Sequence, residues 1–241
     1  MDMLVAVVWG GDGDPAGPEA AGEVLARIGG AAAAPLAALG VREYVVNVRD
    51  EQVAGALIDV RVTERPVLAV IRARVPVASA TACAEVITAL RAVGPVSAWS
   101  TTASEPLPAP EPGPDGRCEG MANIAFLRRP GRIGREEWLH CWLEEHTPVA
   151  IGTQSTTSYT QHAVVRALTA DAPVIDGIVE EVFPIGAATD LAVFFDARGS
   201  EERMTANMRA MTSSTARFLD DGTVDAVPTG RYVMGVRAAG V

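Results

Sequence analysis

His146 is the strongest of three histidine candidates for chemistry in this chain of 241 residues. Trp138, Trp142 and His146 recur at helical spacing, which places two indoles and an imidazole on one side of a helix. Partial burial lowers the pKa of an imidazole, so the neutral ring can accept a proton near pH 7. We therefore expect His146 to act as a general base. The alternative is a structural histidine at the helix end, where a protonated ring favours the helix dipole.

His162 lies in the middle of an expected strand, within the run Tyr159-Thr-Gln-His-Ala163. Side chains alternate along a strand, so Tyr159 and Gln161 face one side and His162 faces the other. One of these two faces must pack beneath helices. Two possibilities stay open for His162: a catalytic group that pairs with His146, or a core histidine whose hydrogen bonds are satisfied.

The same alternation separates Glu180 from Glu181, so one of them points into a buried surface if their strand is central. A buried carboxylate needs a partner, and Arg128, Arg166 or Arg231 could supply it. A structural ion pair is the simpler interpretation. The functional interpretation makes Glu180 a general acid or an acceptor for a substrate hydroxyl, because carboxylates with strongly shifted pKa values occur often in clefts.

The sequence predicts no metal site. His140 is six residues from His146, which is off the i, i+3 or i+4 spacing that lets two ligands share one metal. Glu136 and Glu144 flank His140 and indicate a charged outer helix face. The three cysteines are far apart and form no C-x-x-C pair, so neither a zinc ribbon nor a disulfide framework is expected.

No bound cofactor is expected either, although the segment Gly11–Ala16 fits the dinucleotide-binding pattern G-x-G-x-x-A. Asp12 and Asp14 would place negative charge beside the phosphates of such a cofactor. We therefore interpret the segment as a simple glycine turn. A nucleotide-dependent oxidoreductase is kept as a minor alternative that rests on this pattern alone.

Composition excludes several classes of protein. The net charge is −10 and all twenty basic residues are arginine, so binding to nucleic acid or to an anionic membrane surface is not expected. The absence of lysine removes the P-loop lysine and the Schiff-base lysine. Since the chain shows neither a basic leader nor an apolar run of about 18 residues, we expect a cytoplasmic protein.

The elements that must position these residues follow one order twice. Expected strands cover residues 4–8, 44–48, 67–73 and 96–101, and then 122–127, 157–168, 174–183 and 232–236. Expected helices cover residues 18–39, a stretch that begins at Ser79, residues 134–149 and residues 200–219. Pro148 is expected to break the third helix.

Strand–helix–strand twice in each half is typical of the ferredoxin-like βαββαβ unit. We therefore expect an α+β protein with two tandem ferredoxin-like domains, residues 1–104 and 120–241, and a proline-rich linker at 105–119. Each domain leaves one face of its sheet bare. The two sheets are expected to pack face to face as an intramolecular dimeric α+β barrel, with an apolar cleft mainly on the second-half side.

The second half resembles the EthD domain family over roughly residues 120–237. The resemblance rests on four pieces in matching order and spacing: Phe126–Gly131, Arg135–Trp138, Trp142–Pro148 and Asp176–Glu180. The first half is similar in layout only and looks like a degenerate copy, with Asn47 at the position of His162. The resemblance implies a dimeric α+β barrel completed within one chain.

Members of this wider group include small dehydratases, cyclases and monooxygenase-like proteins that act on hydrophobic ring compounds, so the resemblance implies an activity of this kind. From the residues and this resemblance together, we expect cofactor-independent proton transfer on a small hydrophobic cyclic compound, by a lyase or an isomerase. Expected catalytic residues are His146, His162 and Glu180, and expected substrate contacts are Trp138, Trp142, Tyr159 and Arg128. The alternative is a non-catalytic binding or accessory protein. Internal pairing permits a monomer and equally a homodimer.

Overall fold

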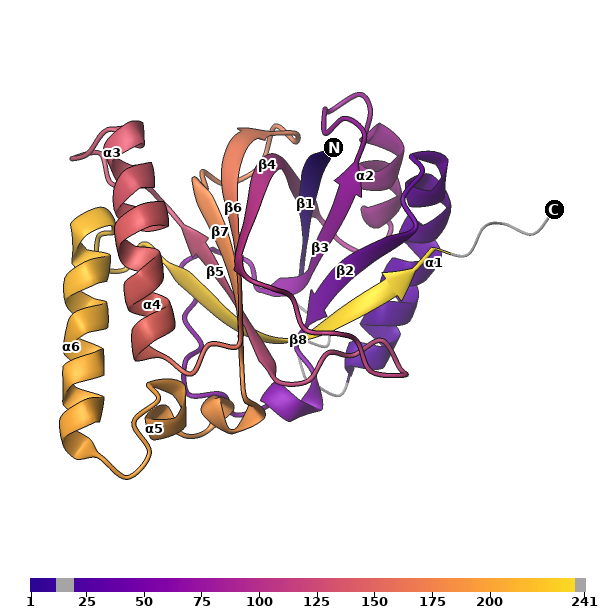
Figure 1. The fold of residues 1–241 in the computed structure, drawn as a ribbon. Coiled ribbons are helices and arrows are strands. Elements are labelled where there is room, and N and C mark those ends of the chain that lie inside the picture. The colour runs from indigo at the N-terminus through magenta and orange to yellow at the C-terminus, as the bar shows by residue number, and fades with distance from the viewer. Residues whose placement is uncertain (12–19, 237–241) are drawn as a thin grey trace.

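Eight strands close into one antiparallel barrel in the computed structural model, which describes residues 1–11 and 20–236 (Figure 1). Around the barrel the strand order is β1-β3-β2-β8-β5-β7-β6-β4. The strands are β1 (Asp2–Trp9), β2 (Glu43–Val48), β3 (Val67–Val75), β4 (Val96–Leu107), β5 (Met121–Leu127), β6 (Ser158–Ala167), β7 (Gly177–Phe183) and β8 (Asp225–Gly235).

The expected pair of tandem ferredoxin-like domains with stacked sheets is wrong. The two halves join at their strand edges instead: β2 pairs with β8, placing Asn47 opposite Arg231, and β4 pairs with β6, placing Ala103 opposite His162. Edge strands carry unpaired N–H and C=O groups, and closing the barrel pairs the edge strands of one half with those of the other. Hydrophobic alternation does not specify which edges meet, so the sequence pattern could not decide between stacking and closure.

The strand β4 also continues through Leu107, and so enters the segment expected to be a linker.

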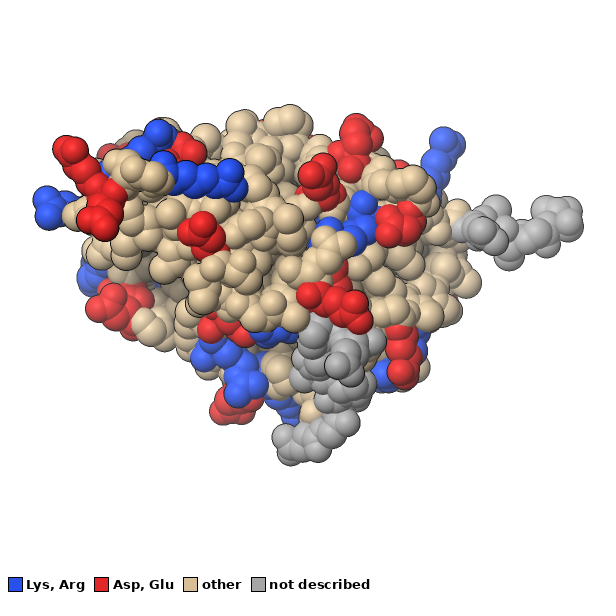
Figure 2. Space-filling view, turned by 90° about the horizontal axis from the view of Figure 1, so that it is seen from below, with Lys and Arg blue, Asp and Glu red and all other residues tan. Residues whose placement is uncertain are grey.

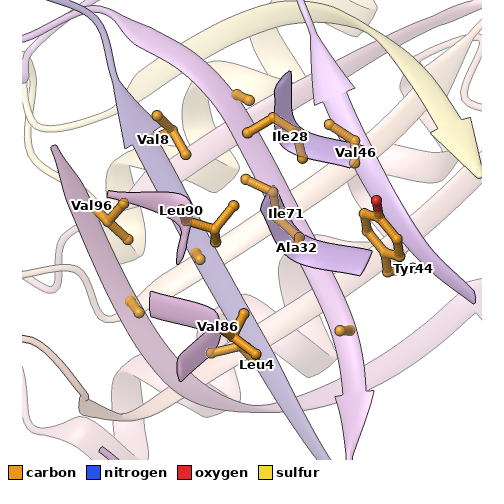
Figure 3. Close-up of a cluster of buried hydrophobic side chains, with 14 of the residues drawn as sticks. Leu4, Val8, Ile28, Ala32, Tyr44, Val46, Ile71, Val86, Leu90 and Val96 are labelled. Carbon is orange, nitrogen blue, oxygen red and sulfur yellow. The ribbon is translucent and has the colours of Figure 1, made fainter. Parts of the chain in front are cut away.

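Helices α1 (Ala21–Ala38) and α2 (Ala84–Leu90) cover the outer face of the first-half strands. Ile28 and Ala32 of α1 and Leu90 of α2 are fully buried against outward-facing strand residues such as Val8 and Ile71 (Figure 3). This apolar layer stabilises the first half but contains few groups that could take part in chemistry.

The second-half helices lie on the opposite side of the barrel, far from α1 and α2 (Figure 1). They are α3 (Arg135–His140), a π-helical turn (Cys141–His146), α4 (Thr147–Thr153) and α6 (Glu201–Phe218). Three shorter helical segments complete the described elements: Glu51–Val53, Ile185–Ala188 and α5 (Leu191–Phe194). Ser200 caps α6 by accepting a hydrogen bond from the Arg203 N–H at 3.1 Å.

Pro148 does not break the third helix as expected. A π-helical turn precedes it, in which the Thr147 N–H donates to the carbonyl oxygen of Trp142, five residues earlier. The Thr147 hydroxyl donates to the same oxygen at 3.0 Å. The wider turn accommodates the missing N–H of Pro148, and the helix continues to Thr153. His146 ends this turn, so the local irregularity fixes where the imidazole lies.

Side chains alternate between the barrel interior and the helix-covered outer face. The interior holds one apolar cluster with members from both halves, among them Val7, Val70, Phe126 and Ile178. Basic and acidic side chains are interspersed over the face of the molecule shown in Figure 2. Within the described part of the chain, every helix is too short or too polar to span a bilayer.

Candidate functional site

A cavity of about 450 Å³ lies between the outer face of the second-half strands and the helices that cover them. Apolar side chains form most of its wall, including Trp142, Met211 and Phe218. We call it the helix-side cavity. The polar side chains that line it include Asn123, His146, Gln154, Tyr159 and Glu181.

Three of these polar residues form one row across neighbouring strands. Glu181 on β7 is directly opposite Asn123 on β5 and directly opposite Tyr159 on β6. Because residues in register share a face of the sheet, all three point toward the helices. The sheet therefore presents a carboxyl, a carboxamide and a phenol side by side to the helix-side cavity.

His146 reaches the same cavity from the π-helical turn. Its Nδ1 lies 2.9 Å from the Ser214 hydroxyl on α6, and its ring packs against Phe218 with centroids 4.8 Å apart. Burial lowers the pKa of His146 to about 4, so the ring is neutral at pH 7. Among the described residues, Nε2 has no hydrogen-bond partner. The geometry leaves this nitrogen available for a bound molecule.

Glu181 is a carboxyl in a setting that favours its protonated form. Burial raises the pKa of Glu181 to about 8. Its Oε1 is enclosed and unpaired within the described part of the structure. Near neutral pH most Glu181 side chains therefore carry a proton that can be donated.

Further unpaired polar atoms belong to residues that line the helix-side cavity. Asn123 Oδ1 and Gln154 Oε1 are buried and have no partner in the structure as described. Buried polar groups are almost always paired, with protein, water or ligand. Several such atoms around one apolar cavity indicate a place where a partly polar molecule binds.

The two expected tryptophans have different positions. Trp142 lines the helix-side cavity, whereas Trp138 packs behind it with ring centroids 4.9 Å apart. Gly177 makes room for both: a Cβ there would lie 2.6 Å from Cη2 of Trp142 and 3.0 Å from Cη2 of Trp138. Tyr159 lines the cavity, and burial, reinforced by the Glu181 carboxylate, raises the pKa of its phenol well above its ordinary value.

His162 and Glu180 lie on the other face of the same strands, inside the barrel. His162 contacts Arg72 and Thr101, each at 3.5 Å, and is 1% exposed. Glu180 is ion-paired to Arg72 and to Arg231. The wall of the barrel therefore separates them from His146, and the structure does not bring the two histidines together. The ion pair expected as the simpler role of Glu180 is present, with Arg231 as one of the partners.

Arg128 does not reach the helix-side cavity. Its guanidinium donates to Asp225 Oδ2 at 2.8 Å and to the Thr223 carbonyl oxygen at 2.8 Å. It lines a separate cavity at one end of the barrel, together with Trp9 and Ser97. Its placement favours a structural role at the start of β8.

Within residues 1–11 and 20–236, no three His, Cys, Asp or Glu side chains gather as a metal site would require. His140 is on the helix surface beside Glu144 and Glu145, at 3.2 and 3.7 Å. Of the glycine turn Gly11–Ala16, only Gly11 is among the described residues.

Sequence reasoning missed Glu181, Asn123, Gln154 and Ser214. The alternation of Glu180 and Glu181 was a usable signal, but the carboxylate facing the helices was not the one chosen. Ser214 lies in α6 (Glu201–Phe218), a helix whose residues carry no catalytic pattern. Its role depends on the approach of α6 to the π-helical turn, which only the folded chain shows.

No model of a known protein family matches the chain. No curated protein sequence matches it significantly. Similarity appears at the level of solved structures. An anthrone oxidase-like protein superposes with a TM-score of 0.54 at 10% identity, covering 100% of this chain and 97% of that one. The fold is shared.

Two further structures align less well. One is a protein from Fusobacterium nucleatum provisionally described as a monooxygenase, with a TM-score of 0.46 at 10% identity, covering 99% of this chain and 94% of that one. The other is a mutant chlorite dismutase from Candidatus Nitrospira defluvii, with the same TM-score and identity, covering 95% of this chain and 91% of that one.

EthD is not among the names of these three structures, so the family resemblance stays a prediction. The lyase class expected from the sequence is contradicted, because the structure with the shared fold is described as anthrone oxidase-like and not as a lyase. The tandem repeat of ferredoxin-like domains is likewise replaced by a single closed barrel.

Proposed function

We propose that this chain is a small-molecule enzyme that removes a proton from an apolar ring compound bound in the helix-side cavity. The observation that carries the proposal is the position of His146. Its neutral imidazole, with one ring nitrogen free, lines a mainly apolar cavity whose wall holds several unpaired polar atoms. Such an arrangement suits general-base catalysis on a hydrophobic substrate.

His146 is the base in this proposal. With its Nδ1–H donating to Ser214, the ring keeps a lone pair on Nε2, which accepts the substrate proton. Ser214 then serves as a positioning residue that selects the tautomer and holds the ring. The contact with Phe218 limits rotation of the imidazole.

Glu181 is the acid in this proposal. A substrate that loses a proton from a carbon whose anion is conjugated with a carbonyl group develops negative charge on the carbonyl oxygen. The protonated Glu181 carboxyl donates a hydrogen bond to that oxygen, and Asn123 beside it adds a second polar contact. Trp142, Phe218 and Met211 provide the apolar surface that holds the rings.

Anthrone is a suitable first probe, because the fold is shared with a protein described as anthrone oxidase-like. It is a rigid ketone with three fused rings, and its methylene proton is acidic because the anion is delocalised onto the carbonyl oxygen. A molecule of this size suits a cavity of about 450 Å³.

Anaerobic titration with anthrone tests binding, and NMR-detected exchange of the methylene protons in D₂O tests proton removal. The proposal expects saturable binding together with exchange above the uncatalysed rate. Saturable binding without any accelerated exchange would support the alternative of a non-catalytic binding protein. Absence of both would reject this class of substrate.

A further inference from the structure

A second group of buried charges lies inside the barrel, on the face of the sheet opposite the helix-side cavity. Arg72 of β3 and Arg231 of β8 both pair with Glu180 of β7, the latter through Nε at 3.2 Å from Oε2. Asn47 of β2 donates to Glu180 Oε1 at 2.8 Å and accepts from Arg72 at 3.0 Å. Four strands from both halves thus supply one cluster, which we call the barrel cluster.

The barrel cluster holds two guanidinium groups and one carboxylate. The side chains of Arg72, Arg231 and Glu180 are 5%, 9% and 1% exposed, respectively. Arginine stays charged at all ordinary pH values, whereas His162, with Nε2 at 3.5 Å from Arg72, is neutral because burial lowers its pKa to about 3. No other acidic side chain of the described chain pairs with either arginine. The barrel cluster thus has one more positive than negative charge. Burying a charge without a partner is costly, so one further negative group would stabilise the cluster.

Several N–H donors of the two arginines in the barrel cluster have no acceptor among the described residues. Arg72 Nε is buried without a partner among the described residues, and its NH1 reaches only His162 Nε2 at 3.5 Å. Arg231 uses Nε on Glu180 and NH1 on Cys118 Sγ, at 3.2 and 3.0 Å. Its NH2 has no partner within residues 1–11 and 20–236. Two forked donors therefore retain free N–H groups.

Both arginines line a cavity of about 500 Å³ at the end of the barrel where the N-terminus lies (Figure 1). We call it the barrel cavity. The barrel cavity is also lined by Met3, Val45 and Val233, so apolar side chains lie beside the two arginines. A volume of this size is typical of small-molecule sites.

We propose that the barrel cavity binds a small organic carboxylate, with the carboxylate against Arg72 and Arg231 and the apolar body against Met3, Val45 and Val233. One negative charge completes the barrel cluster, whereas a doubly charged phosphate would exceed it. Two oxygens in a plane match the forked donors of guanidinium groups. The proposal is independent of the chemistry at His146, because the barrel wall separates the two cavities.

Isothermal titration with benzoate tests the inference, with benzamide and inorganic phosphate as matched probes. We expect one saturable benzoate site and at least ten-fold weaker binding of benzamide, which has the same shape without the charge. Phosphate should also bind more weakly than benzoate. Equal binding of benzamide, preference for phosphate, or no saturable benzoate site would overturn the proposal.

Two variants locate the site. Arg72→Met removes the uncompensated charge and leaves Glu180 paired with Arg231, so we expect at least ten-fold weaker benzoate binding and no lower melting temperature without ligand. Val45→Phe fills the barrel cavity without touching an ion pair, and so tests the site even if Arg72→Met fails to fold. Arg203→Gln, at an exposed position on α6 that does not line the barrel cavity, is the control and should bind benzoate as the natural protein does.

Benzoate binding that survives Val45→Phe would place the ligand elsewhere and contradict the proposal. His146→Ala should leave benzoate binding unchanged. Failure of the proposed proton transfer and failure of this carboxylate site can thus be told apart.

Discussion

His146 and Ser214 are joined by a 2.9 Å contact between Nδ1 and the hydroxyl oxygen, which links the π-helical turn to α6. They are 68 residues apart in the sequence. The contact fixes one nitrogen of a neutral imidazole and leaves the other for a ligand. The proposed chemistry of the helix-side cavity depends on this pair.

Ser214→Ala should lower the rate of proton transfer without abolishing it. The variant removes one hydrogen bond of about 1 kcal/mol, so we expect a fall in kcat of about five-fold with little change in KM. Steady-state kinetics with anthrone measure both constants. Thr212→Ala, on the same helix and also lining the cavity, is the matched control. A larger effect on KM than on kcat would argue that Ser214 contacts substrate and does not position the base.

The pH dependence of kcat/KM should follow the two perturbed groups. Burial lowers the pKa of His146 to about 4, so the base is neutral at every pH above that value. Burial raises the pKa of Glu181 to about 8, so the acid is lost above that value. The profile should be flat between about pH 5 and 7, whereas an ordinary histidine would already lose activity below about pH 6.5. Glu181→Gln should remove the decline at high pH.

Glu181→Gln should stabilise the protein at high pH and have little effect at low pH. In the unfolded chain the carboxyl titrates near 4.5, whereas burial raises its pKa to about 8 in the folded chain. Between these values the folded state holds a proton that the unfolded state has lost, so stability falls as pH rises from about 4.5 to about 8. Glutamine does not titrate.

Thermal melts of the natural protein and Glu181→Gln between pH 5 and 8.5 measure this effect, with exposed Glu136→Gln as control. The difference in Tm should be small at pH 5 and grow to a plateau near pH 8. A difference that is constant across the range would show that the Glu181 carboxyl is not desolvated.

Gly177→Ala should destabilise the second half. The added Cβ would lie 2.6 Å from one atom of Trp142, a distance that forces the indole to move. Overpacking of this kind costs about 1–3 kcal/mol, and it should also narrow the helix-side cavity. Chemical denaturation measures the loss. Gly131→Ala has open space around the new Cβ and should change stability much less. Equal stability of the two variants would contradict the described packing.

The sequence predicted the positions of most strands and helices, because they depend on local patterns. The runs at 4–8, 44–48, 67–73 and 122–127 all fall within strands of the barrel. It did not predict that β2 meets β8 and β4 meets β6, because pairing of edges is a long-range choice. Pro148 was also misleading, since the π-helical turn before it is set by contacts that no local rule encodes.

The candidate site was predictable in part. The stripe that holds Trp142 and His146 is visible in the sequence, and both residues do line one cavity. Period-two alternation correctly placed Glu180 and Glu181 on opposite faces of the sheet, and likewise His162 and Tyr159. It does not determine which of the two faces the helices cover. Closure of the whole barrel decides which face becomes the interior, and Glu180 and His162 lie on that interior face.

The proton exchange of anthrone in D₂O, compared between His146→Ala and His140→Ala under anaerobic conditions, tests the proposed base most directly. Both variants remove an imidazole from the same helical stretch, but His140 is on the surface beside Glu144 and Glu145. We predict that His146→Ala loses about 100-fold or more of the catalysed exchange and keeps its fold, whereas His140→Ala exchanges as the natural protein does. Unchanged exchange in folded His146→Ala would contradict this prediction.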